Sequence, residues 1–469
     1  MRWTSSGRNR LAPAWLPLRF RRRHDKPDRN DLRQGTASME SVRERLDQIL
    51  ARLAARADRE TVFSRLYPEA ARTAADAADA RRKAGVSLGP LDGRIVSIKD
   101  LFDVAGEPTL AGSRLRASAP PAARDALVVA RLRRAGAVIL GKTAMTEFAF
   151  TAIGDNPHYG TPHNAADASR IPGGSSSGAG VSVAEGTSEI SIGSDTGGSV
   201  RIPAALNGVV GFKPTARRVP LSGAFPLSFT LDSIGPLARS VADCAIADAV
   251  MAGEEWSGLP AASLAGLRIG VPRGRLFEHM EDGIAAAFDL CLRDLERAGA
   301  HVTETGMDDL LSEMRTATRH ASIAALEGAE VHADWLAKGA AAPVDPHVSG
   351  PLARAAQVLA PVYIRAMRRR AELVAVMDER LAGFDLLALP TVPVFAPNIE
   401  AMADDEKLRE RTEGLLLRNT QMANQFDLGA ISLPMPGTDL PAGLMLVARH
   451  GRDHRLLAMA AAVEALLAG

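Results

Sequence analysis

Apolar residues recur along the chain at helical and strand spacing, and the alternation between the two spacings indicates an α/β fold. The stretch MESVRERLDQILARLAARA, which begins at Met39, carries apolar residues every three or four positions and predicts a helix. The Ala-rich stretch that follows predicts further helix to about Lys83, with a break near Pro68. GRIVSIKDLFDV then predicts a buried strand that ends in a loop.

The remaining elements continue the alternation. DALVVARLRRAGAVILGKTAMTEFAF predicts helix, strand and helix, whereas residues 153–180 are rich in Gly, Pro, Asn and Ser and predict a long irregular segment of the kind that carries function. LRIGVP, FDLLALPTVPV and LPAGLMLVA predict strands, residues 307–380 predict mainly helix, and HRLLAMAAAVEALLAG predicts a closing helix. Neither a repeat nor a linker divides this pattern, so we expect one mixed α/β domain over residues 39–469.

Composition narrows the function classes. Of the 469 residues, 46% are hydrophobic and 24% charged, which is typical of a globular protein, and the formal charge of +1 argues against a general nucleic-acid binder. The absence of an apolar run of 18 residues argues against a membrane-spanning helix. Cys244 and Cys291 are too few for a disulfide framework or a cysteine-ligated metal, so we expect a cytoplasmic protein.

The first residues differ from the rest. Residues 1–36 carry ten Arg or Lys against three Asp, a net charge of +7, so the total of +1 leaves −6 for the remainder. No apolar stretch follows the basic cluster, which argues against a secretory signal. We predict a basic, disordered extension over residues 1–38; a transit peptide, a nucleic-acid arm and an over-called start codon stay open as alternatives.

Residues 136–143, GAVILGKT, match the phosphate-binding loop pattern G-x-x-x-x-G-K-[ST]. Such a loop turns its backbone N–H groups around an anion and follows a strand. Here a charged helix end precedes Gly136, and AVIL itself is the predicted strand, which we expect to end at Gly141. Its N–H groups are then committed to a sheet, so we interpret the match as scaffold.

Two clusters rich in Gly and Ser carry the most specific signal: RIPGGSSSGAG at 170–180 and GSDTGGSVRIP at 193–203. They offer backbone N–H groups and hydroxyls, which suit an oxyanion better than a metal. Residues 174–178 also fit G-x-S-x-G, the nucleophile elbow of α/β-hydrolase esterases, with His450 and His454 downstream. That elbow needs a core strand directly before it, and ADASRIPG is too polar for one.

Lys99 stands at the end of the predicted strand in VSIKD. Burial disfavours the ammonium ion and lowers the pKa of the amine, which would let it act as a base. An ion pair with Asp100 is the alternative interpretation.

Lys99 together with GGSSSG and DTGGSVR closely resembles the amidase signature family. The resemblance spans nearly the whole predicted domain, with further matches in GKTAMTEFAF, NPHYGTP, NGVVGFKPT and LDSIGPLARSVAD. It implies a single amidase-signature domain, in which a mixed β-sheet is covered by helices on both sides. It also implies a hydrolase that needs no cofactor and no metal.

The resemblance assigns a Ser-cisSer-Lys triad to Ser199, Ser175 and Lys99. Ser199 would attack the carbonyl carbon, Ser175 would bridge with a cis peptide bond before it, and Lys99 would accept the proton. The backbone N–H groups expected to form the oxyanion hole are those of Thr196, Gly197, Gly198 and Ser199. The expected supporting residues are Asp195, Arg201 and, through a hydrogen bond near Lys99, Ser176.

One position departs from the family pattern: Arg217 in TARRVP stands where many relatives have Gly, which puts the local turn in doubt. His158 and His163 are five apart without nearby Cys or paired carboxylates, so a zinc site there is disfavoured.

The resemblance predicts an amidase that cleaves a small or medium-sized amide to a carboxylate and ammonia or an amine through an acyl-enzyme. The alternative is the glutaminase component of a glutamine-dependent tRNA amidotransferase, which shares the triad and works with a partner protein. We expect a small-molecule amide as substrate, neither nucleic acid nor membrane as partner, and a homodimer as one option for assembly.

Overall fold

The computed structural model describes residues 40–338 and 343–468 of the chain. The contacts divide the chain into Met1–Glu40 and Ser41–Gly469, and every described helix and strand lies in the second unit. The extension predicted over residues 1–38 falls outside the described residues, so it stays a prediction. None of the described helices is long and apolar enough to span a bilayer.

A single mixed sheet organises the second unit. Its spatial order is β1-β3-β2-β4-β6-β5-β10-β11-β9-β7-β8, in which β3, β2 and β4 run parallel, as do β9, β7 and β8, while the remaining pairs are antiparallel. The strands are β1 (Phe63–Leu66), β2 (Ile95–Lys99), β3 (Val138–Thr143), β4 (Ile190–Asp195), β5 (Val210–Lys213), β6 (Ser233–Ala238), β7 (Arg268–Val271), β8 (His301–Glu304), β9 (Leu386–Pro390), β10 (Gly429–Pro434) and β11 (Gly443–Ala448).

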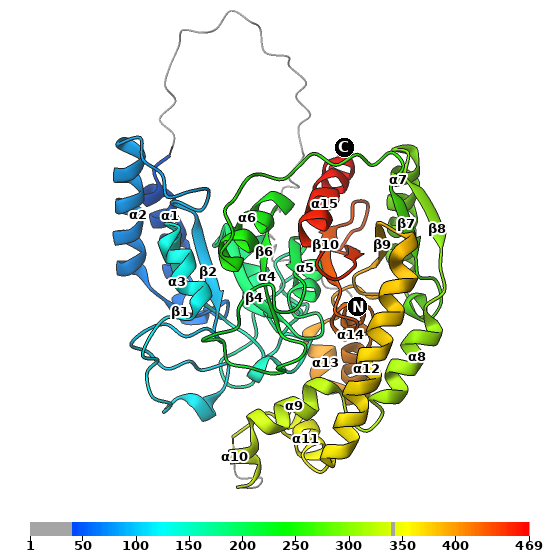
Figure 1. Cartoon of the computed structure of the whole chain (residues 1–469). Helices are drawn as coiled ribbons and strands as arrows, with labels where there is room; N and C mark the ends of the chain where they lie inside the picture. The colour runs from blue at the N-terminus through cyan, green and yellow to red at the C-terminus, as the bar shows by residue number, and fades with distance from the viewer. Residues whose placement is uncertain (1–39, 339–342, 469) are drawn as a thin grey trace, which may run out of the picture. The chain divides into compact units, whose positions relative to one another are not determined.

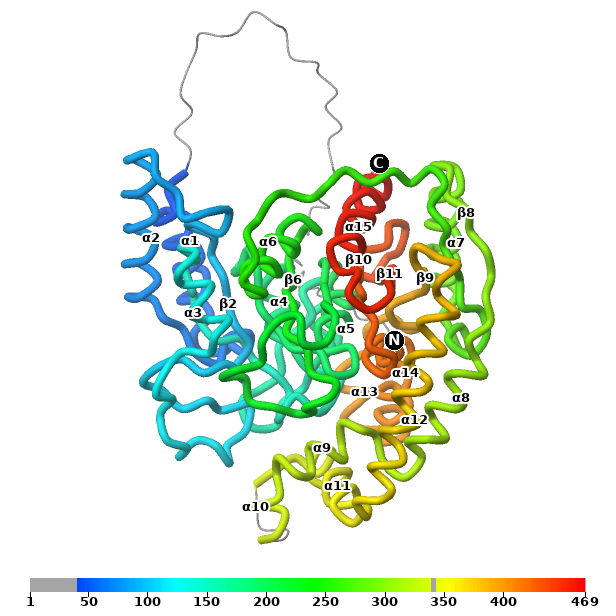
Figure 2. The backbone as a smooth tube through the Cα atoms, in the orientation of Figure 1, coloured from blue at the N-terminus to red at the C-terminus, as the bar shows by residue number. Residues whose placement is uncertain are grey.

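Helices cover both faces of this sheet, as predicted (Figures 1 and 2). The largest apolar cluster joins one face to α3, α6, α7 and α15, while separate clusters join the other face to α1 and α2, to α4 and α5, and to α8, α12 and α14. The helices are α1 (Val42–Ala54), α2 (Pro68–Lys83), α3 (Leu127–Arg134), α4 (Ser177–Ala184), α5 (Arg201–Asn207), α6 (Val241–Ala252), α7 (Asp282–Arg297), α8 (Asp308–Ala317), α9 (Ile323–Val331), α10 (Ala333–Leu336), α11 (Pro346–Ala355), α12 (Ala360–Arg380), α13 (Ile399–Asp404), α14 (Glu406–Gln425) and α15 (Asp453–Leu467).

Strand β2 shows how the sequence directs Lys99 to one face. Successive side chains of a strand point to opposite faces, and Val96 and Ile98 belong to the large apolar cluster. Ser97 and Lys99 therefore point to the opposite face, where α4 lies. The hydroxyl of Ser97 donates to Ser191 of β4 at 2.7 Å, so this polar side of β2 stays hydrogen-bonded although it is buried.

The segment that matches a phosphate-binding loop is part of the sheet. Strand β3 does not end at Gly141, as the sequence analysis expected, but continues to Thr143, which lies opposite Lys99 of β2. Lys142 is buried, with its Nζ 3.1 Å from Glu107 and 3.5 Å from Asp100. Asp100 is thus an ion-pair partner of Lys142.

The N-terminal helices are confirmed as α1 and α2, with one element missed between them. Helix α1 begins at Val42 because Ser41 and Glu44 form a capping box. Strand β1 then pairs antiparallel with β3 at the edge of the sheet before Pro68 opens α2. Only four residues long, β1 is too short for its apolar spacing to show in the sequence.

Candidate active site

A cavity of about 750 Å³ opens beside the second Gly/Ser cluster. Thr196, Gly197 and Ser199 form part of its wall, and apolar side chains from several segments form much of the rest. These apolar residues are Phe150, Ile153, Leu227, Leu231, Ile323, Pro346, Pro351 and Leu417. Volumes of this order hold ligands up to drug size, so the cavity is large enough for an organic amide.

Helix α14 forms one wall of the cavity along a single face. Glu406, Arg409, Glu410 and Glu413, at helical spacing, line the cavity together with Leu417, Gln421 and Gln425 further along the helix. Uncharged side chains thus lie near the Gly/Ser cluster, and the ionisable ones lie toward the start of the helix.

Lys99 lies in full burial against the first Gly/Ser cluster. Its Nζ is 2.7 Å from Ser175 Oγ and 2.9 Å from Ser194 Oγ. The peptide bond between Gly174 and Ser175 is cis. Burial lowers the pKa of Lys99 to about 7, although the charges of Asp232 and Asp195 oppose this. Near neutral pH, therefore, a large share of this amine is unprotonated.

The two Gly/Ser clusters meet through their backbones, because the N–H of Ser176 donates to the carbonyl of Ser199 at 3.2 Å. Exposure decreases from one serine to the next: Ser199 lines the cavity, whereas Ser175 and Lys99 are fully buried. The structure thus brings the three predicted triad residues together in the order cavity, Ser199, Ser175, Lys99.

The loop from Thr196 to Ser199 presents free donors beside the cavity. Among the described residues, no protein atom accepts a hydrogen bond from the N–H groups of Gly197, Gly198 or Ser199. Gly198 has φ +138°, and a Cβ there would lie 2.2 Å from Thr420 Oγ1, so glycine is required. The Thr420 hydroxyl in turn donates to the Gly197 carbonyl at 2.6 Å. Such a loop can receive an oxyanion.

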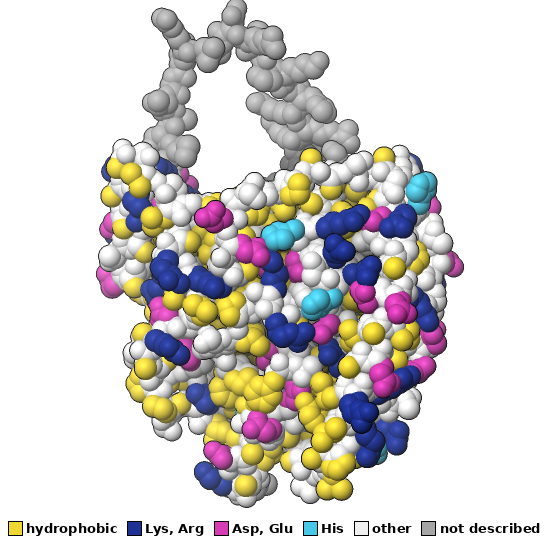
Figure 3. All heavy atoms as spheres, in the orientation of Figure 1, with side chains coloured by type: hydrophobic (Ala, Val, Ile, Leu, Met, Phe, Trp, Pro, Cys, Tyr) yellow, Lys and Arg dark blue, Asp and Glu magenta, His cyan; other side chains and the backbone are white. Residues whose placement is uncertain are grey.

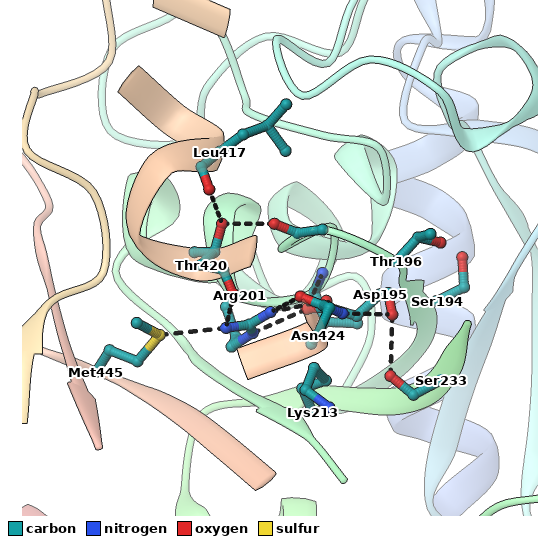
Figure 4. Close-up of polar contacts among 12 residues, drawn as sticks. Ser194, Asp195, Thr196, Arg201, Lys213, Ser233, Leu417, Thr420, Asn424 and Met445 are labelled. Carbon is teal, nitrogen blue, oxygen red and sulfur yellow. Dashed lines mark hydrogen bonds and ion pairs between the residues drawn. The ribbon is translucent and has the colours of Figure 1, made fainter. Parts of the chain in front are cut away.

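Asp195 and Arg201 form a buried ion pair behind this loop (Figure 4). Arg201 donates through Nε at 3.0 Å and Nη2 at 2.9 Å, and Asn424 Nδ2 donates to the same carboxylate at 2.9 Å. Arg201 also donates to the Thr420 carbonyl at 2.8 Å. Burial alone would raise the pKa of Asp195, but the Arg201 charge and these hydrogen bonds lower it to about 2. The pair joins β4, α5 and α14 around the loop.

Ser176 lies at the start of α4, and its hydroxyl donates to the Ser194 carbonyl at 3.3 Å. The sequence analysis expected the further hydrogen bond near Lys99 to come from Ser176. In the structure, the second hydroxyl that contacts Lys99 is that of Ser194.

Four residues of the site escaped the sequence analysis: Ser194, Asp232, Thr420 and Asn424. Thr420 and Asn424 are four apart on α14 and therefore share one helical face, which was a signal available in NTQMANQFD. Ser194 and Asp232 carry no such signal, because only the sheet register brings them close to the Gly/Ser clusters.

Arg217 adopts the left-handed conformation, with φ 71°. This is the position where many relatives have Gly, so the turn forms with an arginine in it. The Arg217 guanidinium donates to Asp427 at 3.1 Å, a contact that holds the strained residue in place.

The esterase elbow is absent from the described structure. A loop, not a strand, leads into residues 174–178, and α4 follows. His450 faces the Asp427 carbonyl, and His454 lies 3.0 Å from Glu254. Neither histidine lines the cavity.

His158 lies 2.9 Å from the buried Glu147, and His163 lies 2.6 Å from the Ala168 carbonyl. No group of three or more His, Cys, Asp or Glu suited to a metal ion occurs within residues 40–338 and 343–468. The two histidines thus have hydrogen-bonding partners in the protein.

A family model described as Amidase matches residues 44–457. The chain belongs to the amidase signature family. It is 37% identical over 407 residues to the 2-amino-5-chloromuconic acid deaminase of Comamonas testosteroni, a match that covers 85% of this chain and 86% of that relative. It is 34% identical to the GatA-type component of the glutamyl-tRNA(Gln) amidotransferase of Chloroflexus aggregans, with 87% of this chain and 89% of the relative covered.

A solved crystal structure of an amidase resembles this amidase-family chain with a TM-score of 0.81 at 34% identity, over 91% of this chain and 96% of that one. The predicted fold and family are therefore confirmed. The family consists of enzymes that hydrolyse C–N bonds.

Proposed function

We propose that this amidase-family protein hydrolyses an organic amide to a carboxylate and ammonia or an amine, with Ser199 as nucleophile. The observation that carries the proposal is the buried amine of Lys99, 2.7 Å from the Ser175 hydroxyl, behind the cavity that Ser199 lines. A serine hydroxyl is a weak nucleophile near neutral pH and needs a base within hydrogen-bond reach.

In the acylation half-reaction, Ser199 Oγ bonds to the carbonyl carbon while its proton passes to Ser175, whose own proton passes to neutral Lys99. The carbonyl oxygen becomes an oxyanion and accepts hydrogen bonds from the backbone N–H groups of the loop Thr196–Ser199. Collapse breaks the C–N bond, and the proton held by Lys99 returns through Ser175 to the leaving nitrogen. Ammonia or an amine leaves, and Ser199 carries the acyl group as an ester.

In the deacylation half-reaction, water takes the place of the leaving group. Lys99 accepts the water proton through Ser175, the hydroxide oxygen bonds to the acyl carbon, and the ester C–O bond breaks. Ser199 regains a proton and the carboxylate leaves. Asp195 and Arg201 support the loop without contacting the substrate, and each step uses only groups of this chain and water.

Replacement of the nucleophile tests the proposal. Ser199→Ala should lower kcat by on the order of 10⁴-fold or more and abolish labelling by a fluorophosphonate, because no acyl-enzyme can form. Ammonia release from a panel of aliphatic, aryl, dicarboxylic and carboxylated-urea amides measures kcat, and mass spectrometry measures labelling. Full activity of the variant on the amide that the wild type prefers would disprove the proposal.

The glutaminase component of a tRNA-dependent amidotransferase is the second candidate, because one curated relative of that kind is 34% identical over most of both chains. Such a component would hydrolyse glutamine in company with a partner protein. Glutaminase activity that appears only when a copurifying partner is added would favour this candidate, whereas turnover of other amides by the isolated chain would favour the stand-alone enzyme.

A further inference from the structure

A second buried carboxylate, Asp232, lies directly before β6 and connects two segments of the cavity wall. One of its oxygens accepts from the hydroxyl of Thr196 at 2.5 Å. The other accepts from the N–H groups of Leu227 at 2.9 Å and Ser228 at 3.1 Å. The carboxylate thus ties the loop that holds Ser199 to the loop that carries the apolar wall residues Leu227 and Leu231.

The two buried carboxylates near Lys99 differ in their partners. Asp195 has Arg201 beside it, which compensates its charge. Asp232 has three hydrogen-bond donors but, within the described part of the chain, no Arg, Lys or His within ion-pair distance. Its negative charge is therefore not neutralised by an adjacent cation and acts on Lys99 through a low-dielectric interior.

We propose that Asp232 is a positioning residue, whose carboxylate fixes the Thr196 end of the nucleophile loop and whose charge sets the protonation of Lys99. This rests on the proposed function only in taking Lys99 as the base. Three donors pointing at one carboxyl group favour its ionised form. Burial raises the pKa of Asp232, while these donors and Lys99 oppose that rise.

Other charged groups near Lys99 are already compensated. On β4, Asp195 is paired with Arg201, and on the adjacent strand β3, Lys142 lies against Glu107 and Asp100. Helix α4, which packs against β2, contains no ionisable side chain from Ser177 to Ala184. Removal of the Asp232 charge should therefore be felt at Lys99 more strongly than removal of any more distant charge.

Asp232→Asn separates charge from shape. The amide oxygen can still accept from the Leu227 and Ser228 N–H groups, and the amide nitrogen can donate to the Thr196 hydroxyl, so the geometry is kept while the charge is lost. Without the negative charge the ammonium form of Lys99 is less stable, so the pKa of Lys99 should fall by about one pH unit.

The titration is read directly by NMR of the full-length protein labelled with ¹³C at lysine Cε. The chain has only seven lysines, and a Lys99→Arg variant identifies the Lys99 signal. This measurement needs no turnover. Should Lys99 titrate as expected in a protein that hydrolyses none of the amides, the proposed function fails and the role of Asp232 stands.

Asp453→Asn is a matched control, because the Asp453 carboxylate also accepts from a backbone N–H and a threonine hydroxyl, both of Thr215 at 2.7 Å. The Asp453 charge acts on Lys213 and not appreciably on Lys99. This variant should leave the Lys99 titration unchanged. Where Asp232→Asn fails to fold, Asp232→Ser is measured in the same way.

Thr196→Val tests the positioning half of the proposal, because it cuts the link and keeps the charge. We expect the Lys99 midpoint to stay within about 0.3 pH units of wild type and kcat to fall by about tenfold with KM little changed. An Asp232→Asn titration that matches wild type overturns the charge role. A Thr196→Val variant with wild-type kcat overturns the positioning role.

Discussion

Lys99 combines full burial with hydrogen bonds to two serine hydroxyls, and it has no carboxylate within ion-pair distance among the described residues. An ammonium ion is expensive in such a place, and the amine responds by a pKa lowered to about 7. A base is useful near the pH at which it loses its proton, so the burial that destabilises the charged lysine also makes it fit for proton transfer.

The pH dependence of kcat/KM should follow this titration. Neutral Lys99 is the active form, so activity should rise with pH through about 7 and then level off. Lys99→Ala should lower kcat by on the order of 10³-fold or more, because Ser175 loses its base. Initial rates between about pH 5 and pH 9 measure both effects. A flat profile in the wild type would contradict the assigned role.

Gly198 and Gly197 are a matched pair in the nucleophile loop. Gly198→Ala places a methyl group 2.2 Å from Thr420 Oγ1 at a positive φ, so the loop must move and kcat should fall by about 10²-fold. Gly197→Ala meets only the flexible Leu417 side chain at 3.2 Å and should cost less. Ammonia release measures both variants, and equal losses would show that crowding at Thr420 is not the cause.

The sequence carried the reacting residues well, because each Gly/Ser cluster keeps its donors and hydroxyls within one short segment. It did not show Ser194 or Asp232, because their places depend on strand register over long separations in the chain. A single residue type also misled: Lys142 completes a nucleotide-binding pattern by letters, yet it is a buried ion-pair partner of Glu107.

At the scale of elements, strand and helix ends converge on the nucleophile loop. β4 ends at Asp195, α5 begins at Arg201, and α14 passes behind with Thr420 and Asn424. The strand and the long helix have apolar spacing of their own in the sequence. Their convergence could not be predicted, because it depends on a sheet in which β4 pairs with β6 and β5 pairs with β10.

Arg201 is the central residue of this convergence. Arg201→Met leaves the Asp195 carboxylate buried without its cation and should lower the free energy of unfolding by about 3–5 kcal/mol. Because the folded-state pKa of Asp195 is below its ordinary value of 3.8, this stabilisation is present at neutral pH and is lost as pH falls toward about 2. Urea denaturation at neutral pH measures the change.

The surface pair of Arg369 with Glu372 provides the comparison, since Arg369→Ala should cost far less stability where solvent screens the charges. A double variant, Asp195→Asn with Arg201→Met, should recover part of the loss because no charge is left unpaired. A loss in Arg201→Met no larger than that of Arg369→Ala would refute the central role of Arg201.

At the scale of the whole molecule, the cavity is built from segments far apart in the chain. Its wall includes residues near 150, the loop 227–231, α9, α11 and α14, which only the complete fold brings together. A sequence cannot reveal such a wall, so the class of enzyme was predictable and the form of its cavity was not. Acidic and basic side chains are interspersed over the outer face in Figure 3.

Leu231 offers a test of the cavity as the site of the acyl group. Leu231→Trp fills part of the space beside Ser199 and should lower kcat/KM for bulky aryl amides by about tenfold or more, with little effect on a short aliphatic amide. Leu231→Met keeps the volume and should discriminate less. Kinetics on both amides decide the matter; an equal loss on the two substrates would place the acyl group elsewhere.

The distribution of lysines has a practical consequence. Lys99, Lys142 and Lys213 are buried, whereas Lys83, Lys338 and Lys407 are exposed. Amine-directed chemistry reaches the exposed group first and cannot approach the buried one while the fold persists. Coupling this protein to a support through its amines should therefore fasten it at a few surface points and leave the proposed base unmodified.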